Sequence, residues 1–551
     1  MQDRMGFLTV RGRRGTSAKA TIWRTVSVLA AAMGVASCLA AADGPPPTST
    51  LRDSSIDRVL VRGYSAIADR YITAIKDYGP LTAEAIKNVS ALDSQIRLEE
   101  RGGALVLYQG DKIIAQRPIP AERDDGPAWG EATAGLVRAA MDASQPLRAA
   151  GRDRVLRAAM DGTARKLDRN SRYSDPVESR DNRFNREGDG GIGVTVEAEN
   201  DQTIVRMVQS GAPADGAGIK PGDRIVSVEG NRVDGKPMRD IVRLLRGRVG
   251  TTVSMGVFRP SESREIVFSI RRAYIIPTTV TYERRGDIAH IKLTGFNKGT
   301  PEALKTALET AAVEIGSGMA GIILDMRDNP GGLLDRSITT ASLLLDSGTV
   351  LTTEGRHPDS RMTFRSSGTA LLARVPMVAL MNGRSASAAE IVAAALQDRG
   401  RAVVVGSTSY GKGTVQTVVP MPNDGELTLT WSRMLAPSGY AWAEIGVLPT
   451  VCTAKFSDSG TLPGELEQRA QEVRRTMAEW HTVRDPTPER VSALRALCPP
   501  SDQSPAKDIE LAERVLHDHT LYARAIGYAT SAIAERPDPP RPWPPQSTGT
   551  R

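Results

Sequence analysis

Apolar and polar residues recur with different periods along the chain, and the period changes near residue 188. From about residue 51 to residue 173, apolar residues recur every three or four positions, which predicts a mostly helical region. Within it, two short apolar runs flank the turn-forming residues 109–111 and predict a β-hairpin over residues 104–115. After a polar, glycine-rich stretch, short strand patterns separated by glycine turns predict a small β-rich module at residues 189–273.

Residues 274–451 have the pattern of an α/β domain with a buried sheet. Short and almost wholly apolar segments alternate there with helical patterns, as expected when helices cover both faces of the strands. The clearest such segments are residues 321–325, 377–381 and 402–406. Helical patterns around residues 466–480, 488–497 and 509–534 then precede a proline-rich tail that we expect to be disordered. We therefore expect a multidomain α/β protein with helical regions at residues 43–188 and 452–551.

The N-terminus has the pattern of an export signal. Six basic residues and one acidic residue precede Thr25, so this segment carries +5 of the formal net charge of +7. The uncharged, small apolar run that follows reaches Ala42 and predicts that residues 1–42 direct export. The rest of the chain is nearly neutral and aromatic residues make up only 4% of the sequence, so a nucleic-acid partner is not expected.

The three cysteines suggest an anchor and a disulfide. Residues 35–38 (VASC) resemble a bacterial lipobox, which makes Cys38 a candidate for lipidation; cleavage at residues 40–42 and an uncleaved anchor are the alternatives. Export permits disulfides, and Cys452 and Cys498 are a natural pair, with two unpaired buried thiols as the alternative. Neither has a histidine at metal-ligand spacing, so no metal site is expected.

Two serines occupy a position that suits a nucleophile. The apolar strand at residues 377–381 is followed by a turn, and Ser385 and Ser387 fall where the next helix begins. Unpaired backbone N–H groups and the positive end of the helix dipole at that point can stabilise an oxyanion. A helix-capping role for either serine is the alternative.

A lysine flanked by glycines, Lys412, follows the next apolar strand. A lysine acts as a base only if its surroundings keep it neutral near pH 7, and serine–lysine pairs then need no histidine. The five histidines fall in no motif that connects to Ser387. The segment GKGT lacks the glycine spacing and residue order of a phosphate-binding P-loop.

Five motifs follow one another in the order found in the carboxyl-terminal processing peptidases, or tail-specific proteases, which residues 160–450 resemble. They are residues 325–332 (DMRDNPGG), 385–390 (SASAAE), 411–416 (GKGTVQ), 436–439 (APSG) and 446–449 (GVLP). The resemblance implies that Ser387 attacks the substrate carbonyl, that Lys412 accepts its proton and that Gln416 orients the lysine.

The same resemblance implies an oxyanion hole made by the N–H of Ala388 and a glycine N–H, from Gly331 or Gly332. It also implies a Clp-protease/crotonase-like α/β core at residues 274–451 and a reaction without metal or organic cofactor. Asp328 and Thr450 stand where the family more often has asparagine and aspartate, and neither belongs to the serine–lysine pair.

Residues 189–273 resemble a PDZ domain inserted before that core. Its carboxylate-binding loop matches Gly191, Ile192, Gly193 and Val194, and the opposite wall of its groove matches Met238, Val242 and Leu245. Such a groove binds a peptide by β-strand addition, while plain core packing is the alternative for the apolar residues.

Together these resemblances predict an exported serine endopeptidase that recognises free C-termini and degrades or processes cell-envelope proteins in the bacterial periplasm. The expected partners are protein substrates, an adaptor or activator, a second copy of the chain and, through the N-terminus, the membrane. A catalytically silent PDZ scaffold is the main alternative, although a scaffold has no need of Ser387, Lys412 and Gln416. A crotonase-like thioester enzyme is a further alternative, but export would separate it from its coenzyme.

Overall fold

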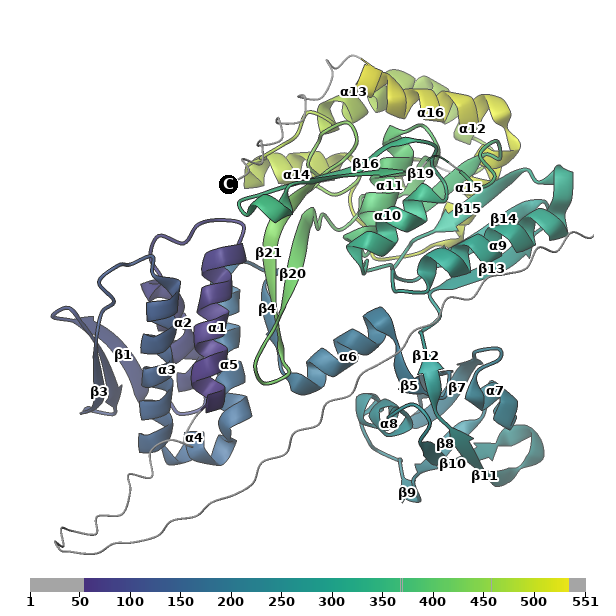
Figure 1. The fold of residues 1–551 in the computed structure, drawn as a ribbon. Coiled ribbons are helices and arrows are strands. Elements are labelled where there is room, and N and C mark those ends of the chain that lie inside the picture. The colour runs from purple at the N-terminus through teal and green to yellow at the C-terminus, as the bar shows by residue number, and fades with distance from the viewer. Residues whose placement is uncertain (1–53, 367, 369, 457, 535–551) are drawn as a thin grey trace, which may run out of the picture. The chain divides into compact units, whose positions relative to one another are not determined.

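The computed structural model describes residues 54–366, 368, 370–456 and 458–534 (Figure 1). The predicted export signal, Cys38 and the proline-rich tail lie outside these residues. Among the helices of the described ranges, none is both long enough and apolar enough to cross a membrane.

The N-terminal region combines helices with a small antiparallel sheet around one apolar core (Figure 1). Its elements are α1 (Ser54–Arg70), α2 (Gly79–Ser90), β1 (Ile96–Arg101), β2 (Ala104–Gln109), β3 (Lys112–Pro118), α3 (Gly126–Ala143), α4 (Gln145–Ala150) and α5 (Arg152–Leu167). The antiparallel pairing of β2 with β3 confirms the predicted hairpin. The sequence did not predict β1, because only Ile96 of that strand is fully buried and, apart from the half-buried Leu98, the rest of it is charged.

The β-rich module has a core of its own. Its elements are β6 (Val194–Glu199), β7 (Gln202–Val208), α7 (Pro213–Ala217), β8 (Arg224–Val228), β9 (Asn231–Arg232), α8 (Met238–Leu245), β10 (Thr252–Arg259) and β11 (Arg264–Arg271). The strands follow the order β11-β10-β8-β7-β6, with β9 paired to β8. The entering strand β5 (Asp189–Gly191) pairs antiparallel with the leaving strand β12 (Ala273–Ile275), so the chain enters and leaves the module at one place.

A buried six-stranded sheet forms the centre of the α/β core, in the order β13-β14-β15-β18-β19-β22. Its strands are β13 (Val280–Arg285), β14 (Ile288–Leu293), β15 (Gly321–Asp325), β18 (Met377–Met381), β19 (Val403–Gly406) and β22 (Val451–Cys452). All neighbours from β14 to β22 are parallel. The predicted strands at residues 321–325 and 377–381 have the bounds of β15 and β18.

Helices cover both faces of this sheet, which explains why its central strands β15, β18 and β19 are buried throughout and apolar at nearly every position. Met377, Ala379 and Met381 of β18 face one apolar cluster, and Val378 and Leu380 face another. The first cluster contains α9 (Thr300–Ile315), α10 (Leu334–Ser342) and α11 (Ala388–Asp398), with residues of α13 (Ala470–Trp480) and α14 (Pro488–Leu497). The second contains α12 (Leu462–Gln468), α15 (Ala506–His517) and α16 (His519–Ala534).

A second, largely antiparallel sheet links the core to the N-terminal region. It consists of β17 (Met362–Ser366), β16 (Gly348–Gly355), β21 (Glu426–Leu435), β20 (Thr414–Pro420) and β4 (Arg172–Ser174), the last paired with β21. Residues near the turn of the β20–β21 hairpin, among them Val419 and Leu427, pack into the N-terminal core. This sheet was not predicted from the sequence. Between β4 and the module lies α6 (Pro176–Glu187).

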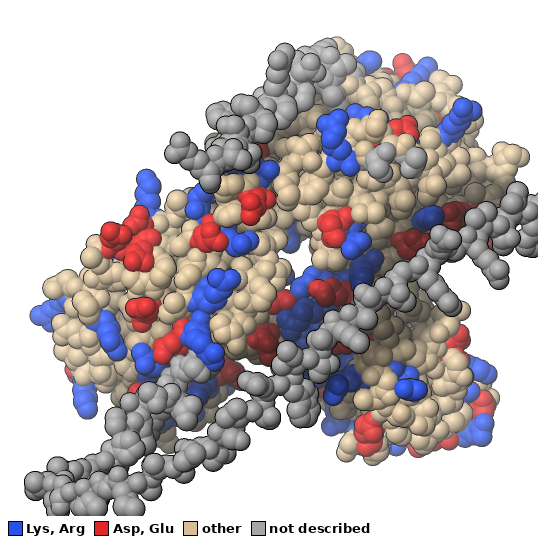
Figure 2. All heavy atoms as spheres, in the orientation of Figure 1, with Lys and Arg blue, Asp and Glu red and all other residues tan. Residues whose placement is uncertain are grey.

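Basic and acidic side chains are interspersed on the face of the molecule drawn in Figure 2. Ion pairs between exposed side chains of the described residues include Arg123 with Glu100 and Arg206 with Glu197. Exposed pairs of this kind add little to stability, because water and salt screen the attraction between the charges. Cys452 and Cys498 are joined by a disulfide with a Cα–Cα distance of 5.9 Å, the pairing that the sequence favoured.

Candidate active site

Ser387 lies directly before α11, at the end of the turn that follows β18. Its φ of 55° is positive, a conformation that a residue other than glycine adopts only when its surroundings enforce it. The Ser387 N–H donates to Glu390 Oε2 at 2.6 Å, and its carbonyl accepts the N–H of Ile391 at 3.0 Å. The serine is thus held in a strained turn at a helix N-terminus, where an oxyanion would be stabilised.

The two serines of this turn have different surroundings. Ser385 is fully buried, and its hydroxyl accepts the N–H of Asn382 and donates to the carbonyl of Met326. Ser387 instead lines a cavity of about 440 Å³. The structure therefore assigns Ser385 to holding the turn and leaves Ser387 facing the open space.

Lys412 lines the same cavity as Ser387. Burial lowers the pKa of its ammonium group, and the nearby positive charge of Arg172 lowers it further, whereas Glu390 raises it. Gly411 has a φ of 90°, and a Cβ atom there would lie 2.8 Å from the backbone of Glu444. The glycine before Lys412 thus lets the loop approach its neighbour closely enough to bring the lysine into the cavity.

Glu390 connects the backbone of the serine to that of the lysine. Its side chain is fully buried; one carboxylate oxygen accepts the N–H groups of Ser387 and Lys412, and the other accepts the Gly411 N–H and the Ser409 hydroxyl. Burial raises the pKa of this carboxyl group, and the four donated hydrogen bonds oppose that rise. No role was predicted for Glu390 from the sequence, although its place three residues after Ser387 is the spacing of a helix capping box.

The predicted oxyanion residues surround the serine. Ala388 is the first residue of α11, where backbone N–H groups have no partner within the helix. A Cβ atom at Gly331 would lie 2.8 Å from the carbonyl oxygen of Ala386, so only glycine fits there. The Gly331 N–H already donates to Asn329 Oδ1 at 2.9 Å, which makes Gly332 the better candidate for the second donor.

Gln416 lines the cavity as well, but its amide contacts other residues. The amide nitrogen donates to the Thr414 hydroxyl at 2.8 Å and lies 3.5 Å from the Thr430 hydroxyl. These contacts hold the side chain along β20 and β21. An orienting contact between Gln416 and Lys412 stays a prediction from the sequence.

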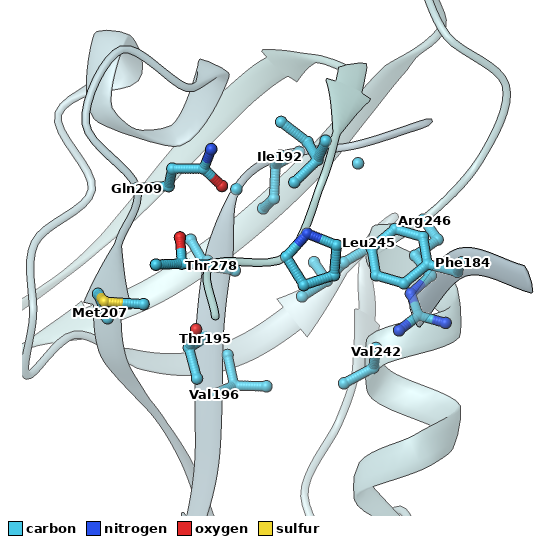
Figure 3. A pocket seen from close by; sticks show the side chains of 15 residues that line it. Phe184, Ile192, Thr195, Val196, Met207, Gln209, Val242, Leu245, Arg246 and Thr278 are labelled. Atoms are coloured by element: carbon cyan, nitrogen blue, oxygen red, sulfur yellow. The ribbon is translucent and has the colours of Figure 1, made fainter. Parts of the chain in front are cut away.

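A second cavity, of about 120 Å³, lies between β6 and α8 of the module (Figure 3). Figure 3 shows Thr195 and Val196 on the strand and Val242 on the helix opposite. Of the residues predicted for the groove, the lining includes Gly191, Ile192, Gly193, Val194, Val242 and Leu245. Met238 is half-buried at the start of α8 and is not among the lining residues.

Two of the lining residues that the sequence did not predict, Phe184 and Arg246, contact each other at one end of the cavity. Phe184 comes from α6, outside the module, and Arg246 directly follows α8. The Arg246 guanidinium lies over the Phe184 ring, 3.6 Å from its centroid, and donates to Asp181 at 2.7 Å. The helix before the module thus closes one end of the groove.

Comparison with known proteins identifies both the α/β core and the β-rich module. Residues 287–453 match the model of peptidase family S41, and residues 190–270 match that of the PDZ domain. A carboxy-terminal-processing protease of Bartonella bacilliformis is 34% identical over 323 residues, which cover 57% of this chain and 74% of that protein. A probable CtpA-like serine protease of Staphylococcus aureus is 32% identical over 316 residues, 56% of this chain and 63% of that protein.

A solved structure resembles the module by itself. The PDZ domain of a carboxy-terminal protease from Vibrio cholerae, in complex with peptide, is 32% identical and covers 16% of this chain and 97% of its own, with a TM-score of 0.15. The family model, the PDZ match and the Bartonella relative agree with the order of motifs in the sequence. The chain therefore belongs to the carboxy-terminal-processing proteases of peptidase family S41 and is a serine-type peptidase with a PDZ domain.

Proposed function

We propose that this peptidase cleaves with a serine–lysine pair, Ser387 as the nucleophile and Lys412 as its base. The observation that carries the proposal is that Ser387, in a strained turn, and Lys412, with a lowered pKa, line one cavity. Neutral Lys412 takes the proton of the Ser387 hydroxyl as the oxygen attacks the substrate carbonyl. Lys412 then returns that proton to the leaving amine, and water hydrolyses the acyl-enzyme.

The developing oxyanion accepts hydrogen bonds from the N–H groups of Ala388 and Gly332. Both groups are fixed before the substrate binds, one by α11 and the other by the tight packing of Gly332 against Phe296. Donors fixed in this way stabilise the charge of the transition state without having to reorganise. Gln416 serves as the orienting residue of Lys412 once substrate fills the cavity.

The charge of Arg172 is expected to matter for the pH dependence of cleavage. Arg172 lowers the pKa of Lys412, so Arg172→Gln raises that pKa and leaves fewer molecules with neutral Lys412 at a given pH. We expect the acidic limb of kcat/KM against pH to move to higher pH, with activity lost at neutral pH and recovered in alkali. Arg165→Gln, on the exposed side of α5, is the control. Identical pH profiles for the two variants would show that the charge of Arg172 does not control the pKa of Lys412.

The PDZ groove is proposed to select substrates with free, apolar C-termini. A backbone edge at β6 and the apolar side chains Val242 and Leu245 suit a strand-like peptide with an apolar last residue. From the N-terminal signal pattern we further propose export to the cell envelope, with Cys38 as a lipid anchor and envelope proteins as substrates. An adaptor or activator and self-association stay proposals of the same kind.

Cleavage of a matched pair of substrates tests this function. The purified protein is incubated with one unfolded protein in two forms, ending either in apolar residues or in two aspartates, and the fragments are followed by mass spectrometry. We expect the apolar form to be cleaved at least about tenfold faster, since most of the gain comes from capture by the groove. Equal rates would remove the groove from substrate selection, and an absence of fragments from both forms would favour the silent scaffold.

A further inference from the structure

The segment between α14 and α15 contacts each of the loops that carry the proposed catalytic groups. We call residues 498–505 the strap; they form neither helix nor strand. The strap begins at Cys498, whose disulfide joins it to Cys452 of β22. At its other end, Arg327 donates to the carbonyl of Pro505 at 3.0 Å and pairs with Asp508 at 3.3 Å. The strap is thus fixed covalently at one end and by a buried ion pair at the other.

One group of its contacts is with the turn that ends at the nucleophile, residues 382–387, which we call the nucleophile turn. The N–H of Gly383 donates to the carbonyl of Ser501 at 2.6 Å. The amide nitrogen of Asn382 donates to the Ser504 hydroxyl at 3.1 Å. The guanidinium of Arg384 donates to the carbonyl of Asp502 at 2.9 Å. Three consecutive residues of the turn are therefore held from the strap.

The other two loops are held as well. The Ser504 hydroxyl donates to Asp328 Oδ2 at 3.0 Å, while the Asn382 amide donates to the other oxygen of that carboxylate at 2.9 Å. Asp328 lies in the loop that carries the oxyanion glycines. On the side of the lysine, the Thr408 hydroxyl donates to the carbonyl of Cys498 at 2.6 Å. Ser504 therefore links the nucleophile turn to the glycine loop, and Cys498 reaches the lysine loop.

These contacts point to control of geometry rather than to general packing. Ser504 and the residues on either side of it are exposed, so they contribute little apolar burial. Their hydrogen bonds go to loops whose relative positions determine the distance between nucleophile, base and oxyanion donors. An error of about 1 Å in such positions can cost about 10² in rate.

We propose that the strap is a positioning element of the active site. Ser504 holds the nucleophile turn against the glycine loop, and the Cys452–Cys498 disulfide anchors the end of the strap that contacts the lysine loop. The inference rests on the proposed serine–lysine mechanism. Ser504 is a positioning residue, because it contacts the loops and not the reacting atoms.

Ser504→Ala tests the proposal, with Gln503→Ala as the matched control on the adjacent exposed residue. Ser504→Ala is expected to lower kcat at least fivefold with KM and Tm unchanged, because the loops lose their link while the fold keeps its core. Hydrogen–deuterium exchange should become faster at the amides of Asp328 and Gly383. The Asp328 N–H donates to the Asn382 side chain, whose amide also contacts Ser504. Gln503→Ala should change neither kcat nor exchange.

Removing the Cys452–Cys498 disulfide provides the second test. The double variant Cys452→Ala/Cys498→Ala is expected to lower kcat at least tenfold and to speed exchange over residues 382–387. If this double variant does not fold, the kcat and exchange of Ser504→Ala alone decide whether the strap positions the loops. A Ser504→Ala protein with kcat within twofold of the control and with unchanged exchange would overturn the proposal. If the unaltered protein cleaves no substrate, the proposed function fails, while the exchange measurement still decides whether the strap positions the loops.

Discussion

Replacing Ser387 with alanine is expected to lower kcat for peptide cleavage by at least about 10³-fold, because the variant lacks the oxygen that forms the acyl-enzyme. The fold should survive, since Ser387→Ala removes only the side-chain half of the capping box and keeps the backbone hydrogen bonds of residue 387 to Glu390 and Ile391. Binding of a peptide with an apolar C-terminus should not change either, because the PDZ domain has a separate core. Initial rates with a fluorogenic peptide and fluorescence anisotropy of a labelled C-terminal peptide measure the two effects.

Ser385→Ala is the matched control for this variant. The buried Ser385 hydroxyl links the N–H of Asn382 to the carbonyl of Met326, so its loss should cost about 1–3 kcal/mol in the free energy of unfolding. Cleavage should persist in the folded fraction of this protein. A fully active Ser387→Ala variant, or an inactive Ser385→Ala variant beside it, would place the nucleophile elsewhere.

Replacing Glu390 with glutamine is expected to lower kcat by about 10²-fold, the cost of misplacing reacting groups by about 1 Å. One carboxylate oxygen accepts two backbone N–H groups, and the other accepts an N–H and a hydroxyl. The amide nitrogen of glutamine cannot accept any of them, and it would face donors in a fully buried site. The serine turn and the lysine loop should therefore move apart while the surrounding sheet stays folded.

The pH profile of Glu390→Gln separates geometry from charge. The negative charge of Glu390 raises the pKa of Lys412, so its removal alone lowers that pKa and favours the neutral lysine. An acidic limb that moves to lower pH while the maximal rate falls would assign the loss to geometry. Glu309→Gln, at an exposed position of α9, is the control. A maximal rate within threefold of the control would show that Glu390 is not needed for positioning.

Much of the site could be predicted because its signals are local. Ser387 and Lys412 each follow an apolar strand, and the glycines beside Lys412 permit a backbone approach that a side chain would block. The central strands could be predicted for a similar reason, because burial on both faces makes β15 and β18 apolar at almost every position. Such patterns depend on neighbouring residues and are visible in the sequence.

Other parts of the site had no such signal. Arg172 comes near Lys412 because β4 pairs with β21, and the sequence gives no sign of that pairing between segments about 250 residues apart. The second sheet escaped prediction for the same reason. The motif contains two serines, and only the family resemblance pointed to Ser387 as the nucleophile. The structure adds a physical reason, because the Ser385 hydroxyl already donates to the carbonyl of Met326.

The sequence by itself determined the family and predicted the residues that carry the proposed chemistry, since the motifs that identify them are short and contiguous. Only the tertiary structure decided which groups hold those residues in place. Glu390 connects the serine turn to the lysine loop, and the strap contacts both of these and the glycine loop. These contacts join polar groups far apart in the chain. Hydrogen bonds of that kind follow no periodicity, so folding alone brings their partners together.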